Sequence, residues 1–169
     1  IDAVTLDGTV TVRANVTGGA VDETIGGVDI DFAADEGDLQ RIEGTDITIG
    51  ITGFVSLTGN VTIEKSGSAP NTKILVGADS VNASLGTPGL AVELANGTLG
   101  LAVYEGVTAN TYALEAQGDV SINGLSALTM GGTVKVRVNS TGGAVNETIG
   151  AASVSFAADE GDLLRMEGT

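Results

Sequence analysis

The stretch GTVTVR at residues 8–13 returns 124 residues later as GTVKVR at residues 132–137. A second stretch, FAADEGDL at residues 32–39, returns unchanged at residues 156–163, at the same offset. The offset holds without a gap between residues 1–45 and residues 125–169, and 29 of these 45 pairs are identical. Identity at this level indicates a recent tandem duplication. We therefore divide the chain into one full period, residues 1–124, and the start of the next, residues 125–169, and expect both to belong to a longer array.

The two copies differ mainly in their charged residues. Acids at Asp22, Asp29 and Asp31 in the first copy are replaced by Asn146, Ser153 and Ser155 in the second. Apolar residues, in contrast, are exchanged for other apolar residues, as Leu6 is for Met130. We expect the exchanged acids to be solvated and the apolar positions to form a core.

A shorter repeat within the 124-residue period predicts the fold class. Apolar and polar residues alternate, as half-buried β-strands do, around glycine or polar corners near residues 8, 37, 59, 80, 97 and 118. These corners recur about every 21 residues, which is in the range of solenoid repeats. The sequence therefore predicts an all-β fold, an elongated β-solenoid (β-helix) of about 21-residue coils. The alternatives are a β-hairpin array, in which Asn96-Gly97 is a tight turn, and tandem β-sandwich domains.

Composition excludes several functional classes. Among 169 residues there is no Cys, His or Trp, so imidazole bases, thiol nucleophiles and ordinary zinc sites are absent. The net charge of −15 disfavours nucleic acid and anionic membranes as partners, because both require a basic surface. No apolar run approaches the ~18 residues of a membrane helix, and no signal peptide is recognisable in this segment. We expect no enzyme, no nucleic-acid binding and no membrane insertion.

The acidic corner that persists in both copies is the candidate metal site. Carboxylates around a glycine turn are hard oxygen ligands of the kind that Ca²⁺ prefers. The alternative is a solvated turn that uses Asp and Gly for its geometry. The candidate Ca²⁺ ligands, and with them the one candidate cofactor, are Asp35, Glu36, Asp38, Asp159, Glu160 and Asp162.

Two further patterns suggest sites. Asn-x-Ser/Thr acceptor patterns predict a glycan-coated glycoprotein, although Asn, Gly and Thr also meet often in turns. The acceptors are Asn15, Asn60, Asn82, Asn96, Asn139 and Asn146. Asp29 and Asp31 share one face of a predicted strand and suggest glycoside chemistry, but both are serine in the second copy, which argues against catalysis.

Several segments of the first period carry a family resemblance. Residues 54–65 (FVSLTGNVTIEK), 74–83 (ILVGADSVNA), 99–104 (LGLAVY) and 112–116 (YALEA), in that order, resemble the tandem-repeat regions of giant bacterial surface and secreted proteins of the adhesin-like, RTX-associated kind. The resemblance implies an extracellular or cell-surface location and an elongated shape, and it carries over no catalytic residue. The chain lacks the calcium-binding nonapeptide of such proteins; residues 26–29 come closest.

These observations together predict a structural segment of an extracellular rod or filament, such as a stalk, sheath, matrix fibre or adhesin shaft. Its expected partners are copies of itself or neighbouring repeats, arranged end to end. The alternative is a surface repeat module that binds Ca²⁺, carbohydrate or another cell-surface ligand.

Overall fold

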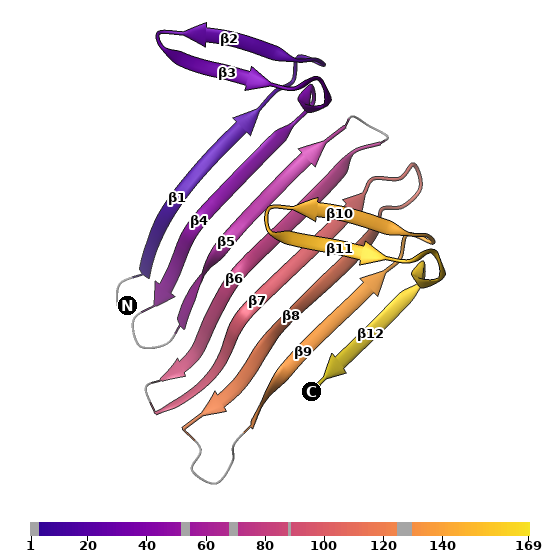
Figure 1. The fold of residues 1–169 in the computed structure, drawn as a ribbon. Coiled ribbons are helices and arrows are strands. Elements are labelled where there is room, and N and C mark those ends of the chain that lie inside the picture. Colours follow the sequence, from indigo (N-terminus) through magenta and orange to yellow (C-terminus); the bar gives the residue numbers. More distant parts are fainter. Residues whose placement is uncertain (1–3, 52–54, 68–70, 88, 125–129) are drawn as a thin grey trace.

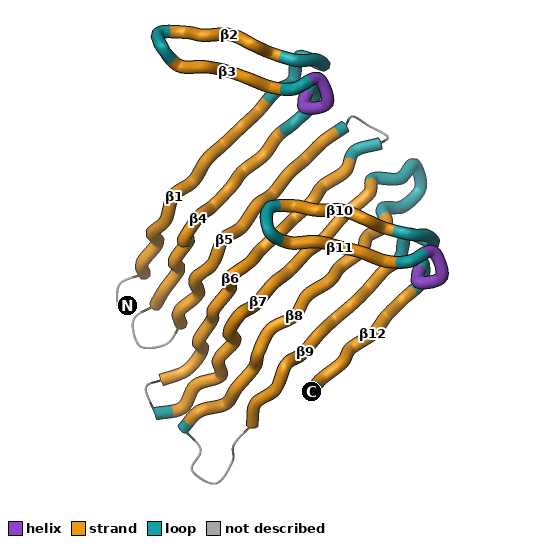
Figure 2. Tube along the Cα trace, viewed as in Figure 1, coloured by secondary structure: helices purple, strands orange, loops and turns teal. Residues whose placement is uncertain are grey.

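The computed structural model describes residues 4–51, 55–67, 71–87, 89–124 and 130–169. These residues form β-strands and two short 3-10 turns, η1 (Ala34–Glu36) and η2 (Ala158–Glu160). The strands are β1 (Val4–Ala14), β2 (Val21–Ile25), β3 (Val28–Phe32), β4 (Gln40–Ile51), β5 (Val55–Ser66), β6 (Lys73–Thr87), β7 (Leu90–Tyr104), β8 (Thr111–Asn123), β9 (Met130–Asn139), β10 (Val145–Ile149), β11 (Ala152–Phe156) and β12 (Leu163–Gly168). The all-β prediction is confirmed (Figures 1 and 2).

One large antiparallel sheet dominates the structure. Its eight strands follow the order β1-β4-β5-β6-β7-β8-β9-β12. The predicted β-solenoid is not confirmed, because every pairing is antiparallel and the described strands form no closed coil. Two separate β-sandwiches are not seen in the described ranges either, since β8 of the first period pairs directly with β9 of the second. Residues 125–129, where the second period begins, lie outside the described residues.

Most of the predicted corners lie in the middle of long strands. The strand pairing shifts register beside Gly8, Gly59, Ser80 and Asn96, which marks β-bulges and irregular positions. The prediction of a turn at Asn96-Gly97 is wrong, because both residues lie inside β7. Asn96 does have a positive φ of 53°, but an Asn with this backbone conformation serves a bulge as well as a hairpin turn.

The bulges keep apolar side chains on one side of the sheet. β8 and β9 pair without a register shift, so their alternation is unbroken. In β4 the extra residue near Asp46 resets the alternation, which leaves Ile42 and Ile49 on the same face. We call this side the apolar face. Its residues include Val10, Val12, Ile42, Ile49, Leu57, Ile63, Val76, Ala83, Val92, Leu101, Leu114, Val120, Val136 and Met166. The opposite side is the polar face.

Each copy of the repeat also contributes a two-stranded hairpin. β2–β3 is inserted between β1 and β4, and β10–β11 is inserted between β9 and β12. The second hairpin lies across the polar face and contacts β5, β6, β7 and β8, whereas the first extends past the edge of the sheet (Figure 1). In the part of the chain that the structure describes, no helix has the length and hydropathy required to span a membrane.

Candidate functional site

The docked hairpin β10–β11 forms the best-buried part of the molecule. Its strands alternate, so that one side faces the sheet and the other faces solvent. The sheet-facing side chains, all at most 5% exposed, are Val145, Ile149, Ala152, Val154 and Phe156. They pack on Leu75, Ala102 and Ala113 of the polar face, with Tyr104 at the margin. The apolar core of the described chain is therefore an interface between a hairpin and a sheet.

Two glycines allow the hairpin to approach the sheet closely. A Cβ atom on Gly100 would lie 2.6 Å from Cγ2 of Val154 and 2.8 Å from the carbonyl oxygen of Ser153. A Cβ atom on Gly77 would lie 2.8 Å from Cγ2 of Ile149 and would also collide with its carbonyl oxygen. Any larger residue at either position would push the hairpin away from the sheet.

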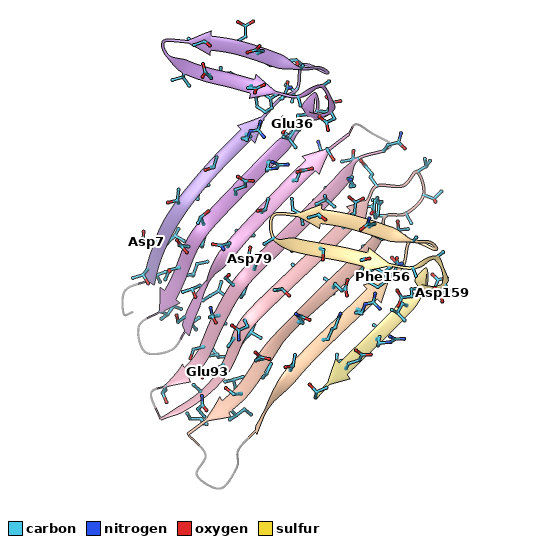
Figure 3. The ribbon with its side chains drawn as sticks, in the orientation of Figure 1. Asp7, Glu36, Asp79, Glu93, Phe156 and Asp159 are labelled. Carbon is cyan, nitrogen blue, oxygen red and sulfur yellow. The ribbon has the colours of Figure 1, made fainter. Side chains whose placement is uncertain are left out.

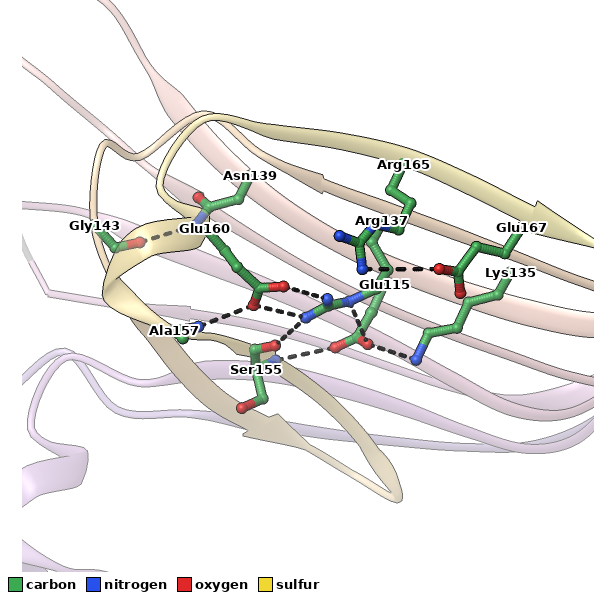
Figure 4. A network of polar contacts seen from close by, with 10 residues as sticks. All are labelled: Glu115, Lys135, Arg137, Asn139, Gly143, Ser155, Ala157, Glu160, Arg165 and Glu167. Atoms are coloured by element: carbon green, nitrogen blue, oxygen red, sulfur yellow. Dashed lines mark hydrogen bonds and ion pairs between the residues drawn. The ribbon is translucent and has the colours of Figure 1, made fainter.

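A network of charged groups joins the base of this hairpin to the sheet (Figure 4). Arg137 of β9 donates to Glu160 of η2 at 2.6 Å, to Glu115 of β8 at 3.0 Å and to the Ser155 carbonyl at 2.8 Å. Its guanidinium carbon also lies 4.5 Å from the centre of the Phe156 ring, within cation–π range. One arginine thus holds the sheet, the hairpin and the turn together.

Glu115 is the sheet's contribution to this network. Its carboxylate accepts hydrogen bonds from the Ser155 amide at 3.1 Å and pairs with Lys135 at 3.0 Å. Partial burial by itself raises the pKa of Glu115, but the hydrogen bonds from Lys135 and Ser155 and the charge of Arg137 outweigh it, so the pKa is lowered. The hydrogen bond from Arg137 likewise lowers the pKa of Glu160. Both groups therefore favour the docked arrangement in their ionised form.

A second polar contact holds β10, the first strand of the hairpin, on the sheet. Glu147 of β10 pairs with Lys73 at 2.9 Å and accepts a hydrogen bond from the Tyr104 hydroxyl at 3.0 Å. Burial, and then the hydrogen bond to Glu147, raise the pKa of Tyr104 above its ordinary value. The hydroxyl stays protonated and acts as a donor at any physiological pH.

The first hairpin has the same base, but none of the described sheet strands lies beneath it. Arg13 pairs with Glu36 at 2.8 Å, donates to the Asp31 carbonyl at 3.0 Å and lies 4.7 Å from the centre of the Phe32 ring. These contacts repeat those of Arg137 within the second copy. The hairpin base therefore forms locally, and contact with the sheet is added to it.

The candidate Ca²⁺ ligands sit at the two 3-10 turns, which lie well apart along the sheet (Figure 3). In each turn the carboxylate of the last residue accepts hydrogen bonds: Glu36 from Arg13 and the Ala33 amide, and Glu160 from Arg137 and the Ala157 amide. Among the described residues, no group of three or more carboxylates is placed to hold a metal ion. The neighbouring acids around these turns are all exposed: Asp35, Asp38, Asp159 and Asp162.

Two of the predicted glycan acceptors are buried turn residues. Asn15 is 3% exposed and Asn139 is 2% exposed. Each side chain donates to the carbonyl of a glycine four residues on, Gly19 or Gly143, and accepts from the backbone two residues on. This is the geometry of an Asx-turn, and it occupies the amide that a glycan would need.

The remaining acceptor residues are exposed or half-exposed. Asn60, Asn82 and Asn96 lie beside the register shifts of neighbouring strands, which together form a row of bulges across the sheet. Asn60 donates to Asp79 at 2.9 Å, Asn96 donates to Asp119 at 3.0 Å, and Asn82 donates to the Ser80 carbonyl. Hydrogen bonds from Thr133 and then Asn96 lower the pKa of Asp119. Asn146 lies exposed on β10. The asparagines of the row thus link the strands across the sheet.

Asp29 and Asp31 are both exposed on β3, with Asp29 accepting a hydrogen bond from Thr24 at 2.8 Å. Their counterparts Ser153 and Ser155 are exposed on the solvent side of the docked hairpin. The exchange of acid for serine therefore occurs at solvated positions that docking leaves open.

Sequence reasoning missed the residues that build the interface. Arg137 stands in a segment that we interpreted as part of the repeat, and Glu115, Tyr104 and Gly100 stand in segments that carry only the family resemblance. One signal was available: Arg13, Phe32 and Glu36 recur together as Arg137, Phe156 and Glu160, and recurrence of an arginine, a ring and an acid predicts a shared contact.

A scan against protein-family models finds no match, and searches of the curated proteins and of the solved structures find none either.

Proposed function

We propose that this chain is a structural segment of an extracellular, repetitive rod or filament, such as a stalk, sheath, matrix fibre or adhesin shaft. One observation carries the proposal: the hairpin of the first copy has an apolar docking side with none of the described strands beneath it, while the equivalent hairpin of the second copy docks on the sheet. A hairpin of this kind is the connector that joins one period of a repeat array to the period before it.

The exposures of equivalent residues support this reading. Ile25 is 68% exposed and its counterpart Ile149 is 3% exposed. Ile30 and Val154 are 37% and 1% exposed, respectively. The docking side of β2–β3 is nevertheless as apolar as that of β10–β11, although its solvent side carries Asp29 and Asp31 where the second copy has serines. An isolated hairpin would have no reason to keep that side apolar.

The two edges of the sheet support the same proposal. β1 is the counterpart of β9 in the other copy. β1 is an edge strand of the described sheet, whereas β9 pairs with β8 on the equivalent side. In the same way β12 is the counterpart of β4, and β4 pairs with β5 on the side that is the free edge in β12. Each free edge is therefore the equivalent of one that is paired elsewhere in the molecule, so the sheet can continue in both directions by pairings already present.

This continuation defines a fibre that differs from the predicted β-solenoid. Six sheet strands belong to each period, from β1 through β8 without the hairpin strands. At about 4.8 Å per strand, each period lengthens the sheet by about 29 Å. In place of stacked coils of about 21 residues, we propose an antiparallel ribbon with one docked hairpin per period. The extracellular location rests on the resemblance described above, and the net charge of −15 limits association between fibres through their polar faces.

A chain with one added period tests the proposal. Residues 1–124 are joined ahead of residues 1–169, and the maximum dimension of both chains is measured by small-angle X-ray scattering. The longer chain should have a larger maximum dimension, by up to about 29 Å, and an unchanged cross-section. Two compact units joined by a linker would contradict the proposal.

A further inference from the structure

The apolar face of the sheet is open across all eight strands. Of the 22 large hydrophobic side chains that are exposed in the described residues, 17 belong to this face. They range from Leu6 on β1, which is 76% exposed, to Met166 on β12, which is 75% exposed, and they include Ile63 and Val92 in central strands. Soluble monomers rarely expose a continuous apolar surface larger than about 600 Å².

We propose that this face packs against the same face of a second copy of the chain, so that two sheets form a sandwich. The inference goes beyond the function proposed above, because hairpin docking uses the polar face and leaves the apolar face free.

The size of the face is sufficient for a stable dimer. Eight strands at about 4.8 Å spacing, each about ten residues long at about 3.3 Å per residue, give a face of about 1,300 Å². A standard stable interface buries about 800 Å² on each partner. The side chains are Val, Ile, Leu and Ala with few rings, a composition that suits two sheets packed about 10 Å apart.

The distribution of charge selects a second copy as the occupant. Among the described strand residues, Lys65 is the one charged side chain on the apolar face. It lies at the end of β5, beside Gln40 and Ile74. The other charged strand residues alternate onto the polar face or lie at bulges, as Arg41, Glu64 and Glu93 do. Two copies with their apolar faces together bring one charged side chain of each copy, Lys65, to the interface, whereas contact through the polar faces would oppose the many charged strand residues of a chain with net charge −15.

Sedimentation equilibrium of the 169-residue chain tests the proposal, with two variants on β5. Ile63→Glu places a charge on the apolar face, and Thr58→Glu places one on the polar face of the same strand. We expect a mass of twice 16.7 kDa for the wild type and for Thr58→Glu at micromolar concentration, and at least tenfold weaker dimerisation for Ile63→Glu. A wild-type monomer up to about 100 µM would overturn the proposal, as would association that persists equally in Ile63→Glu.

A labelling experiment keeps the test valid if Ile63→Glu does not fold. The chain has no cysteine, so Ile63→Cys and Thr58→Cys each provide a single thiol. Maleimide should react with Cys at position 63 at least tenfold more slowly at high protein concentration than after dilution, while position 58 reacts equally at both. Equal rates at position 63, or a monomer that floats with neutral phosphatidylcholine vesicles, would overturn the proposal. Neither result depends on the added period that tests the proposed function.

Discussion

The two hairpins of this protein are nearly the same sequence in two different situations. β10–β11 lies on the polar face with its apolar side chains at most 5% exposed, whereas Ile25 and Val28 of β2–β3 are 68% and 65% exposed. Both have the same Arg–Glu pair at their base and the same cation–π contact. The base of the hairpin therefore depends on local sequence, while burial of its apolar side depends on a neighbouring sheet. This separation is expected of a repeat that is completed by its neighbour.

The largest expected difference in stability is between substitutions of Ile149 and of Ile25, its counterpart in the first copy. Ile149→Ala should lower the free energy of unfolding by about 2–4 kcal/mol, because it removes a buried side chain and leaves a cavity. Ile25→Ala should change it by less than about 0.5 kcal/mol, because its side chain is exposed. Urea unfolding followed by circular dichroism measures both variants. Equal losses would mean that the two hairpins are equally buried in solution.

The close approach at Gly100 is expected to have the next largest effect. Gly100→Ala should cost about 1–3 kcal/mol, because the added methyl meets Val154 and the Ser153 carbonyl. Gly131→Ala is the matched control on β9, where the nearest atom to an added Cβ is the Val120 carbonyl oxygen at 3.7 Å. Thermal unfolding of both variants checks the prediction. A neutral Gly100→Ala would show that the hairpin does not rest on β7.

Acidification should weaken the docked hairpin. The pKa of Glu115 in the folded chain is below its usual 4.5, so the unfolded chain takes up a proton first as pH falls. The stability that Glu115 provides is complete above about pH 4.5 and is lost as pH falls towards the folded pKa. Glu115→Gln should cost about 1–2 kcal/mol at neutral pH and should flatten this decline.

The measurement is urea unfolding of the wild type and Glu115→Gln between pH 7 and pH 3. Glu36 and Glu160 also have lowered pKa values, so a decline should remain in the variant, but a shallower one. Identical pH profiles would show that Glu115 does not contribute to docking of the hairpin.

Calcium should have the smallest effect. Glu36 and Glu160 are each held by an arginine and a backbone amide, so the acidic turns lack free ligands arranged around one point. We expect no change in melting temperature between millimolar Ca²⁺ and chelator. A rise of several degrees would restore the predicted calcium site at Asp35, Glu36 and Asp38.

The strand pattern was predictable from sequence, and the way the strands connect was not. Alternation of apolar residues, as in Ile47, Ile49 and Ile51, is a local property and identifies strands. A glycine or an asparagine with positive φ, however, fits both a tight turn and a bulge, so the sequence does not distinguish a strand end from a bulge at these corners. Asn96 is such a case, since it lies inside β7.

The docking site could not be predicted from the sequence for a different reason. Glu115 and Arg137 come from different strands, and Gly77 and Gly100 acquire their role only once a hairpin crosses them. Sequence spacing does not encode such contacts, because they depend on where β10–β11 folds back onto the sheet. The exchange of acids at Asp29 and Asp31 did predict solvated positions, and their exposure agrees with this interpretation.

We propose that the exposed hairpin of one period docks on the sheet of the period before it. The most direct measurement compares the maleimide reactivity of Ile25→Cys in the 169-residue chain with that of the same substitution in the second period of the chain lengthened by residues 1–124. Ile149→Cys provides the docked reference. We predict that cysteine at position 25 reacts rapidly in the shorter chain and at least tenfold more slowly in the longer one, close to the rate at position 149. Equally rapid reaction in both chains would contradict the claim.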